Sequence, residues 1–220
     1  MISIAIDGPS GAGKSTISRE VAKKLGFIYV DTGALYRAVG LHILRNDVVP
    51  TDAENVTALL DDINIELKYI VDEQRVFLNG EDVSTDIRTP NVSMAASDVS
   101  AIPAVRAFLF DLQRSMGEKY DIVMDGRDIG TVVLPNANVK IFLTASAEER
   151  ARRRYDELYN KGMDIKYEDV LADIEKRDYN DSNRTAAPLR PADDSIYIDT
   201  TGNTLQQSIE LLADTIKQRL

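Results

Sequence analysis

Eight consecutive residues constrain this chain most: Gly8-Pro-Ser-Gly-Ala-Gly-Lys-Ser15 matches the phosphate-binding pattern G-x-x-x-x-G-K-[ST]. Residues 2–6 before it predict a short strand, and residues 14–25 after it place apolar side chains on one face of a helix. The glycines let backbone N–H groups approach a crowded anion, and the helix start adds partial positive charge. Lys14 can reach the outer phosphates, and the Ser15 hydroxyl can take a Mg²⁺ ion that bridges them. The stretch predicts binding of nucleotide phosphates, without deciding whether the nucleotide is hydrolysed, sensed or used to phosphorylate an acceptor.

The residue types that are missing narrow the chemistry. The 220 residues include no cysteine and one histidine, His42, which falls inside a predicted helix. Catalysis must therefore rest on carboxylates, guanidinium and ammonium groups, hydroxyls and metal, a set that suits phosphoryl transfer. The net charge of −10 argues against nucleic-acid binding.

The order of predicted elements indicates an α/β fold. Short buried-type strands at 27–30, 121–124, 139–143 and 195–199 alternate with helices, which predicts a P-loop NTPase-like parallel sheet covered by helices on both faces. Residues 63–84 differ: two strands and an Asn79-Gly80 turn predict a small antiparallel insert. No apolar run approaches the ~18 residues of a membrane span, no basic segment opens the chain, and the lack of cysteine suits the cytosol. We expect a cytoplasmic monomer that does not bind membranes.

Two further polar stretches follow predicted strands, as the phosphate loop does. Asp31–Arg37 offers a hydroxyl, a phenol and a guanidinium at a helix start, and Asp125–Asp128 places two carboxylates around an arginine. Ligands of such sheets bind at the carboxyl ends of the strands, so we expect the three stretches to converge. The alternatives are a capped helix with an exposed arginine and a salt bridge internal to the turn. Asp125 is our candidate for ordering the metal, with a purely structural role as its alternative.

A third stretch, Glu148–Arg154, is rich in arginine for an acidic chain. Its i, i+4 Glu–Arg pairs allow the interpretation of a solvated helix face. Further charged residues near Arg177 and Arg184 instead favour a helical flap that closes over phosphates and excludes water.

Taken together, these stretches resemble the bacterial-type cytidylate (CMP) kinases, which are P-loop nucleoside monophosphate kinases. The resemblance runs nearly from end to end, and its markers are Gly8–Thr16, Asp31–Arg37, Asn79–Ser84, Ile87–Thr89, Ala95–Ser97, Asp125–Thr131, Lys140–Leu143 and Arg177–Leu189. It implies a single kinase domain over 1–220, with a monophosphate-binding insert at about 32–100 and a lid at about 149–190. It also implies phosphate transfer from ATP to CMP or dCMP with Mg²⁺.

The resemblance assigns roles residue by residue. ATP would be bound by Gly8, Pro9, Ser10, Gly11, Ala12, Gly13, Lys14, Ser15, Thr16 and Arg153, and the metal by Ser15 and Asp125. Cytosine would be held by Ser97, Arg106 and Asp128, the monophosphate by Tyr36, Arg37, Arg127 and Arg184, and the ribose by Arg177 and Asp181, with Thr32 nearby. Lys14, Arg127 and Arg184 would be catalytic. Thr32 stands where serine is commoner in the family, which could shift the preference between CMP and dCMP, and Ser15 keeps a hydroxyl where some relatives carry glycine.

Two other readings remain open. The nearest is a kinase of the same fold that acts on UMP, dTMP or a non-nucleotide alcohol. A GTP-dependent switch belongs to a different class, and it usually needs N-K-x-D to read guanine. The stretch Asn160-Lys-Gly-Met-Asp164 has one residue too many and lies in the predicted lid.

Overall fold

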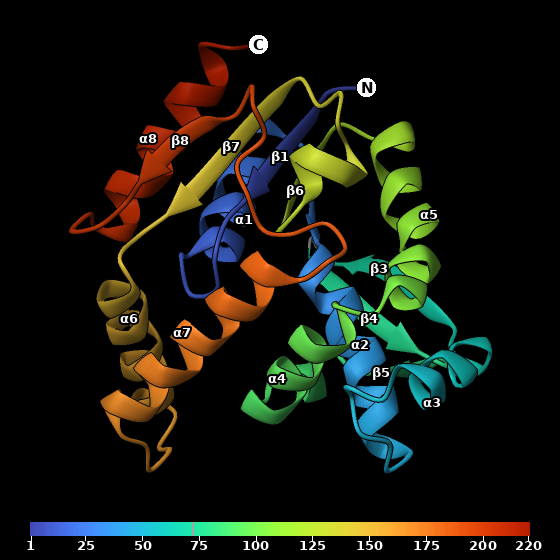
Figure 1. Ribbon diagram of the computed structural model, residues 1–220. Coiled ribbons are helices and arrows are strands. Elements are labelled where there is room, and N and C mark those ends of the chain that lie inside the picture. The colour runs from blue at the N-terminus through green and yellow to red at the C-terminus, as the bar shows by residue number, and fades with distance from the viewer. Residues whose placement is uncertain (72) are drawn as a thin grey trace. The chain divides into compact units, whose positions relative to one another are not determined.

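The computed structural model describes residues 1–71 and 73–220, and these divide into two compact units (Figure 1). The first, here called the core unit, comprises Met1–Tyr29 and Gly117–Leu220. The second, here called the inserted unit, comprises Val30–Met116.

A five-stranded parallel sheet has the strand order β2-β6-β1-β7-β8. β1 is central: it pairs in parallel with β6 and with β7, and the four residues from Ile4 to Asp7 are all buried. Strands buried on both faces are typical of parallel sheets, so the short apolar runs predicted the strands correctly. Their bounds are β1 Ser3–Asp7, β2 Ile28–Asp31, β6 Ile122–Gly126, β7 Val139–Thr144 and β8 Ile196–Asp199.

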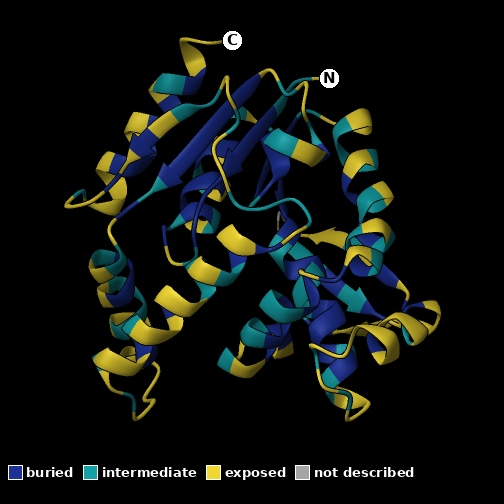
Figure 2. Cartoon of the chain, in the orientation of Figure 1, coloured by how far each residue is buried: buried dark blue, intermediate teal, exposed yellow. Residues whose placement is uncertain are grey.

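Helices pack on both faces of the core sheet, as predicted. On one face, α1 (Lys14–Leu25) and α8 (Leu205–Lys217) share a cluster with Ile4, Ile6 and Val123. Figure 2 shows β1 and β7 of this sheet in the colour of buried residues. Successive strand residues point to opposite faces, so Ile122 lies on the other face. On that face lies the end of α5 (Pro103–Lys119). A side chain at Gly117 of this helix would contact Ile122 and Leu134.

Two further elements of the core unit carry predicted site residues. The π-helical turn η3 (Ile129–Val133) follows β6 directly and was not predicted. α6 (Ala147–Asn160) and α7 (Tyr167–Asn183) pack on each other through a small apolar cluster that includes Ala151, Leu158 and Ile174. These two helices form the segment predicted as a lid.

The inserted unit contains the predicted antiparallel patch. β3 (Ile65–Ile70) pairs with β4 (Glu73–Leu78), and the short β5 (Glu81–Asp82) adds a third strand that was not predicted. Asn79 and Gly80 both have positive φ, 50° and 84°, as a tight hairpin turn requires. The unit's helical elements are α2 (Thr32–Arg45), α3 (Ala53–Ala58), η1 (Leu60–Asp62), η2 (Asp86–Arg88), α4 (Pro90–Val99) and most of α5.

Within the described ranges, no single helix is long and apolar enough to cross a membrane. The pair α4 and α5, bent by 100° between Val99 and Pro103, meets the same length and composition test when taken together. Buried core helices of soluble proteins meet that test as well.

Candidate active site

The phosphate loop depends on the absence of side chains at its glycines. Gly8, Gly11 and Gly13 have φ of 153°, 76° and 82°, values that other residues rarely adopt. A Cβ at Gly8 would lie 1.9 Å from the Leu143 carbonyl oxygen on β7, so only glycine fits. α1 begins at Lys14, and its N-cap Gly13 supplies no side-chain hydrogen bond. The loop therefore leads into a helix start that a bound phosphate could cap.

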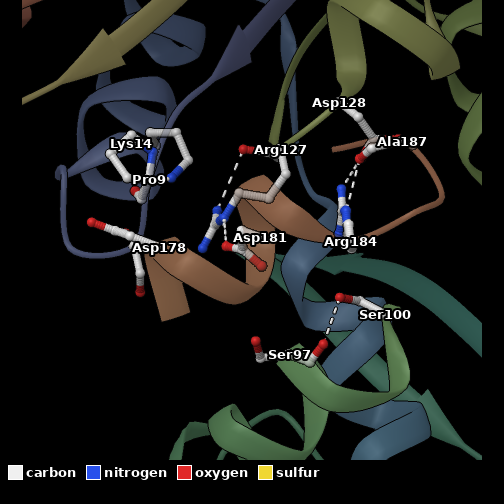
Figure 3. A network of polar contacts seen from close by, with 12 residues as sticks. Pro9, Lys14, Ser97, Ser100, Arg127, Asp128, Asp178, Asp181, Arg184 and Ala187 are labelled. Atoms are coloured by element: carbon white, nitrogen blue, oxygen red, sulfur yellow. Dashed lines mark hydrogen bonds and ion pairs between the residues drawn. The ribbon is translucent and has the colours of Figure 1, made fainter. Parts of the chain in front are cut away.

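Lys14 is buried at this helix start. Its Nζ donates to the Pro9 carbonyl at 2.8 Å (Figure 3). Burial, and then the nearby Arg127 guanidinium, lower the pKa of Lys14 to about 7, although Asp125, Asp181 and Asp7 oppose the shift. An anion placed beside Lys14 would favour its charged form.

Ser15 and Asp125 bring oxygen atoms together as predicted. The Ser15 hydroxyl donates to Asp125 Oδ2 at 3.0 Å, and the Tyr29 hydroxyl donates to Oδ1 at 2.8 Å. Asp125 is buried near the end of β6, so the sheet fixes its position. A hydroxyl and a carboxylate are ligands that suit Mg²⁺, and these two residues therefore fit the predicted metal.

The turn after β6 is joined to α7 by two ion pairs. Arg127 Nε donates to Asp181 Oδ2 at 2.7 Å, and Arg184 Nη2 donates to Asp128 Oδ1 at 3.2 Å (Figure 3). Burial alone would lower the pKa of Arg127, but Asp181, together with Asp125 and Asp178, outweighs it and raises that pKa. A salt bridge confined to the Asp125–Asp128 turn was our alternative, and these two ion pairs instead connect the turn to residues more than fifty positions away.

Arg150 was not among the predicted site residues, although it is the most buried arginine of its helix. Its Nε donates to the Ala145 carbonyl at 2.8 Å, and its Nη1 donates to the Ser10 carbonyl of the phosphate loop at 2.9 Å. Both terminal nitrogens also bind the Asp178 carboxylate, at 3.1 and 2.6 Å. Arg150 thus ties α6 to the loop and to α7. The only signal in the sequence is that the i, i+4 pairs Glu148–Arg152 and Glu149–Arg153 do not include Arg150.

Arg153, one turn further along α6, lies near the loop as well. Its Nη2 donates to the Thr200 carbonyl at 2.9 Å, and its Nη1 is 4.0 Å from the position a Cβ would take at Gly13. The predicted i, i+4 ion pair with Glu149 is present at 3.0 Å. A guanidinium between the loop and the segment after β8 is well placed to contact a nucleotide.

Three charged side chains of the inserted unit lie together at the start of α2. Asp31 caps the helix by accepting from Ala34 N at 3.0 Å, so the cap of our alternative interpretation is present, but its arginine, Arg37, is not exposed. The same buried carboxylate binds Arg37 at 2.8 Å and Arg88 at 3.3 Å. Burial would raise the pKa of Asp31, but the two guanidinium groups lower it. Two cations on one carboxylate leave a net positive charge where Arg37 was expected to meet phosphate.

The other predicted residues of this unit lie on three helices. Thr32 is buried at the start of α2, and Ser97 lies on α4. The Arg106 guanidinium on α5 lies over the Tyr36 ring, 5.7 Å from its centroid.

Several predicted substrate residues hold buried polar atoms that have no partner. Across residues 1–71 and 73–220, such atoms include Nε of Arg37, Oγ of Ser97 and Nε of Arg177. A buried donor without a partner is unfavourable by roughly 1–3 kcal/mol, so it points to a ligand or water in the working protein.

Asp7 was also missed. It ends β1, and its carboxylate accepts from Ile129 N at 2.7 Å and from Gly130 N at 2.8 Å. Burial raises the pKa of Asp7 to about 6, although these two hydrogen bonds oppose the shift. The available signal was a carboxylate at the end of an apolar strand, next to a phosphate loop.

A parallel sheet with a glycine loop, a buried loop lysine and a group of arginines around it defines a P-loop phosphotransferase. The chain belongs to the cytidylate kinase family, whose model matches residues 4–218. It is 52% identical to the cytidylate kinase of Caldicellulosiruptor bescii, over 100% of this chain and 99% of that one. It is 48% identical to the cytidylate kinase of Bacillus subtilis (strain 168), over 99% and 97%. An uncharacterized protein from Eubacterium ventriosum shares the fold, with a TM-score of 0.55 at 14% identity over 100% of both chains.

Proposed function

We propose that this protein transfers the γ-phosphoryl group of ATP to CMP or dCMP and forms ADP with CDP or dCDP. The match of residues 4–218 to the cytidylate kinase family carries the proposal. The unpartnered buried atoms of Arg37, Ser97 and Arg177 support it, because they belong to residues expected to contact the acceptor.

The donor nucleotide binds the phosphate loop. Backbone N–H groups of Gly8–Thr16 surround its phosphates, Lys14 exchanges the Pro9 carbonyl for a phosphate oxygen, and Arg153 covers the base. Ser15 and Asp125 would hold Mg²⁺, which when bound neutralises charge on the phosphates. Asp125 also accepts from Tyr29, so the sheet keeps this carboxylate in place while nucleotides exchange.

The acceptor competes for the two ion pairs of the turn after β6. Its phosphate takes Arg127 and Arg184, together with Tyr36 and Arg37. This releases the carboxylates of Asp181 and Asp128, which bound those arginines. Asp181 and Arg177 then bind the ribose. One substrate thus supplies the anion for the arginines and the polar hydrogens for the carboxylates, so phosphate and nucleoside recognition are coupled.

Base selection follows from the groups assigned to cytosine. The Asp128 carboxylate faces the exocyclic amine, and Ser97 and Arg106 meet the remaining donor and acceptor positions. Uracil presents a carbonyl where cytosine has the amine, so it would leave a buried carboxylate unpaired. A mismatch of that kind discriminates strongly between substrates.

The segment at about 149–190 acts as the lid. Its closure excludes water from the transferred phosphoryl group, which favours transfer over hydrolysis. Lys14, Arg127 and Arg184 then neutralise charge that builds up on the phosphoryl oxygens. We propose that the protein works as a monomer.

A coupled ADP-release assay with ATP and Mg²⁺ tests the proposal, with CMP, dCMP, UMP, AMP and dTMP offered separately. Fast turnover confined to CMP and dCMP supports it. Turnover that favours UMP or dTMP would retain the phosphate loop but remove the roles of Ser97, Arg106 and Asp128. GTP hydrolysis without any phosphorylated acceptor would point to a switch instead.

The variant Asp128→Ala tests base reading directly. We expect the ratio of kcat/KM for CMP to that for UMP to fall by about tenfold or more, the worth of one hydrogen bond to a charged group. Asp193→Ala, at an exposed position before β8, is the matched control and should keep the wild-type ratio.

A further inference from the structure

The turn that carries Asp128 is capped in an unusual way. Asp128 is the N-cap residue of η3, with φ −148° and ψ 27°, yet its side chain makes no capping hydrogen bond. An aspartate at this position normally accepts from the N–H groups that open its own helix. Here Asp128 Oδ1 accepts from Arg184 Nη2 instead.

Asp7 accepts hydrogen bonds from the N–H groups at the start of η3, which the Asp128 side chain does not cap. Its Oδ1 binds the N–H of Ile129, and its Oδ2 binds the N–H of Gly130, so both carboxylate oxygens are used on the first two residues of η3. Asp7 is fixed for this task because its Cα pairs in register with Gly126 of β6 and Phe142 of β7.

Gly130 makes room for the contact. A Cβ at Gly130 would lie 3.4 Å from Asp7 Oδ2 and 3.2 Å from Cδ of Lys140. The backbone of η3 therefore approaches the carboxylate with no side chain between them. Asp7 directly precedes Gly8, so one residue connects the start of the phosphate loop with the turn that bears Asp128.

We propose that Asp7 is a positioning residue for base recognition: it caps η3 in place of Asp128 and thereby leaves the Asp128 carboxylate to read the acceptor base. The proposal rests on the role of Asp128 given under the proposed function. Without Asp7, the Asp128 carboxylate would turn back to cap its own turn, as N-cap aspartates do.

The test measures kcat and KM for CMP, UMP and ATP in Asp7→Asn, Asp128→Ala and the double variant. Asn is isosteric with Asp, but its amide offers one acceptor oxygen and opposes one N–H with its own donors. For Asp7→Asn we expect the CMP/UMP ratio of kcat/KM to fall by about tenfold, with KM for ATP changed less than about twofold. Because Asp7 acts through Asp128, the double variant should show no lower ratio than Asp128→Ala.

Asp121→Asn is the matched control. Asp121 Oδ1 also accepts a backbone N–H across the sheet, from Ile2 at 2.6 Å, but at the opposite end of β1. This variant should change the thermal midpoint and keep the CMP/UMP ratio. Hydrogen exchange at the N–H groups of Ile129 and Gly130 should quicken in Asp7→Asn alone.

A wild-type ratio in Asp7→Asn, beside a lowered ratio in Asp128→Ala, would overturn the proposal and leave the proposed function intact. A double variant with a lower ratio than either single variant would also overturn it, because the two residues would then act independently. An unchanged ratio in Asp128→Ala would remove base reading from Asp128 and this proposal with it, whereas CMP turnover of the wild-type protein tests the proposed function separately.

Discussion

Replacing Arg150 by methionine tests how the core unit holds its helices to the phosphate loop. Methionine keeps the length and apolar stem of the side chain but removes the guanidinium. The wild-type group binds two carbonyls and the Asp178 carboxylate, and the Arg150 side chain is only 5% exposed. The substitution therefore removes four charge-assisted contacts from a nearly dry site.

The magnitude follows from the burial of the two partners. Breaking a buried ion pair by removing one member typically destabilises by about 3–5 kcal/mol. The Asp178 side chain is 26% exposed, so water can satisfy part of its remaining charge, and we expect the lower end, about 3 kcal/mol. For a chain of this size each kcal/mol shifts the thermal midpoint by roughly 2–4 °C, so the midpoint should fall by about 6–12 °C.

Thermal unfolding followed by circular dichroism measures the shift, and Arg152→Met is the matched control. Arg152 lies on the same helix and is exposed, with its guanidinium 4.7 Å from the centroid of the Tyr167 ring. Its loss should destabilise by at most about 1 kcal/mol. Equal midpoints for Arg150→Met and Arg152→Met would refute the reasoning. Because Ser10 loses its tether only in Arg150→Met, KM for ATP should rise in that variant alone.

Four further predictions follow from the core unit. Lys14→Met should lower kcat by about 10²–10³-fold in the ADP-release assay, with a circular dichroism spectrum like that of the wild type; wild-type turnover would contradict the role of Lys14. Gly8→Ala should destabilise by about 3 kcal/mol or more because its Cβ meets the Leu143 carbonyl, whereas Gly26→Ala, with nothing within 4 Å, should destabilise by only about 1 kcal/mol in the same urea titration. The pKa of Asp7 is about 6 in the folded protein against the ordinary 3.8, so the folded state binds that proton more tightly and Asp7 lowers stability as pH rises from 4 to 7. The free energy of unfolding of Asp7→Asn should therefore gain about 2 kcal/mol on the wild type across that range, and a difference independent of pH would refute the assignment. Chelating divalent cations with EDTA should abolish turnover, and added Mg²⁺ should restore it.

The parts of the fold that local pattern determines were predicted correctly. Strands such as β1 and β6 follow from short apolar runs. β5 was missed because two residues carry no periodicity. η3 was missed because its wide turn is set by contacts with Asp7, which lies 122 residues earlier in the chain.

In the candidate site, too, the features that follow from local sequence were predicted and those that depend on distant contacts were not. The phosphate loop and the placement of Ser15 beside Asp125 follow from the motif and from the rule that strand ends converge. The pairing of Arg127 with Asp181 and of Arg184 with Asp128 was not predicted, because the sequence shows which charges exist and not which ones form ion pairs. The roles of these residues toward CMP, the bounds of the lid and of the monophosphate-binding insert, and the monomeric state stay predictions.

Asp7 and Arg150 escaped sequence reasoning for a common physical reason. Each is a buried charge that binds backbone groups far away in the chain, Ile129 and Gly130 for Asp7 and Ser10 for Arg150, although Arg150 also pairs with Asp178. Backbone partners can belong to any residue type, so no side-chain motif marks them. Yet burying an ionised group is unfavourable unless the structure satisfies it fully, and that requirement makes such contacts specific. Both charges lie beside the phosphate loop: Asp7 directly precedes Gly8, and Arg150 binds the Ser10 carbonyl, so the surroundings of the loop depend on charges that the motif does not contain.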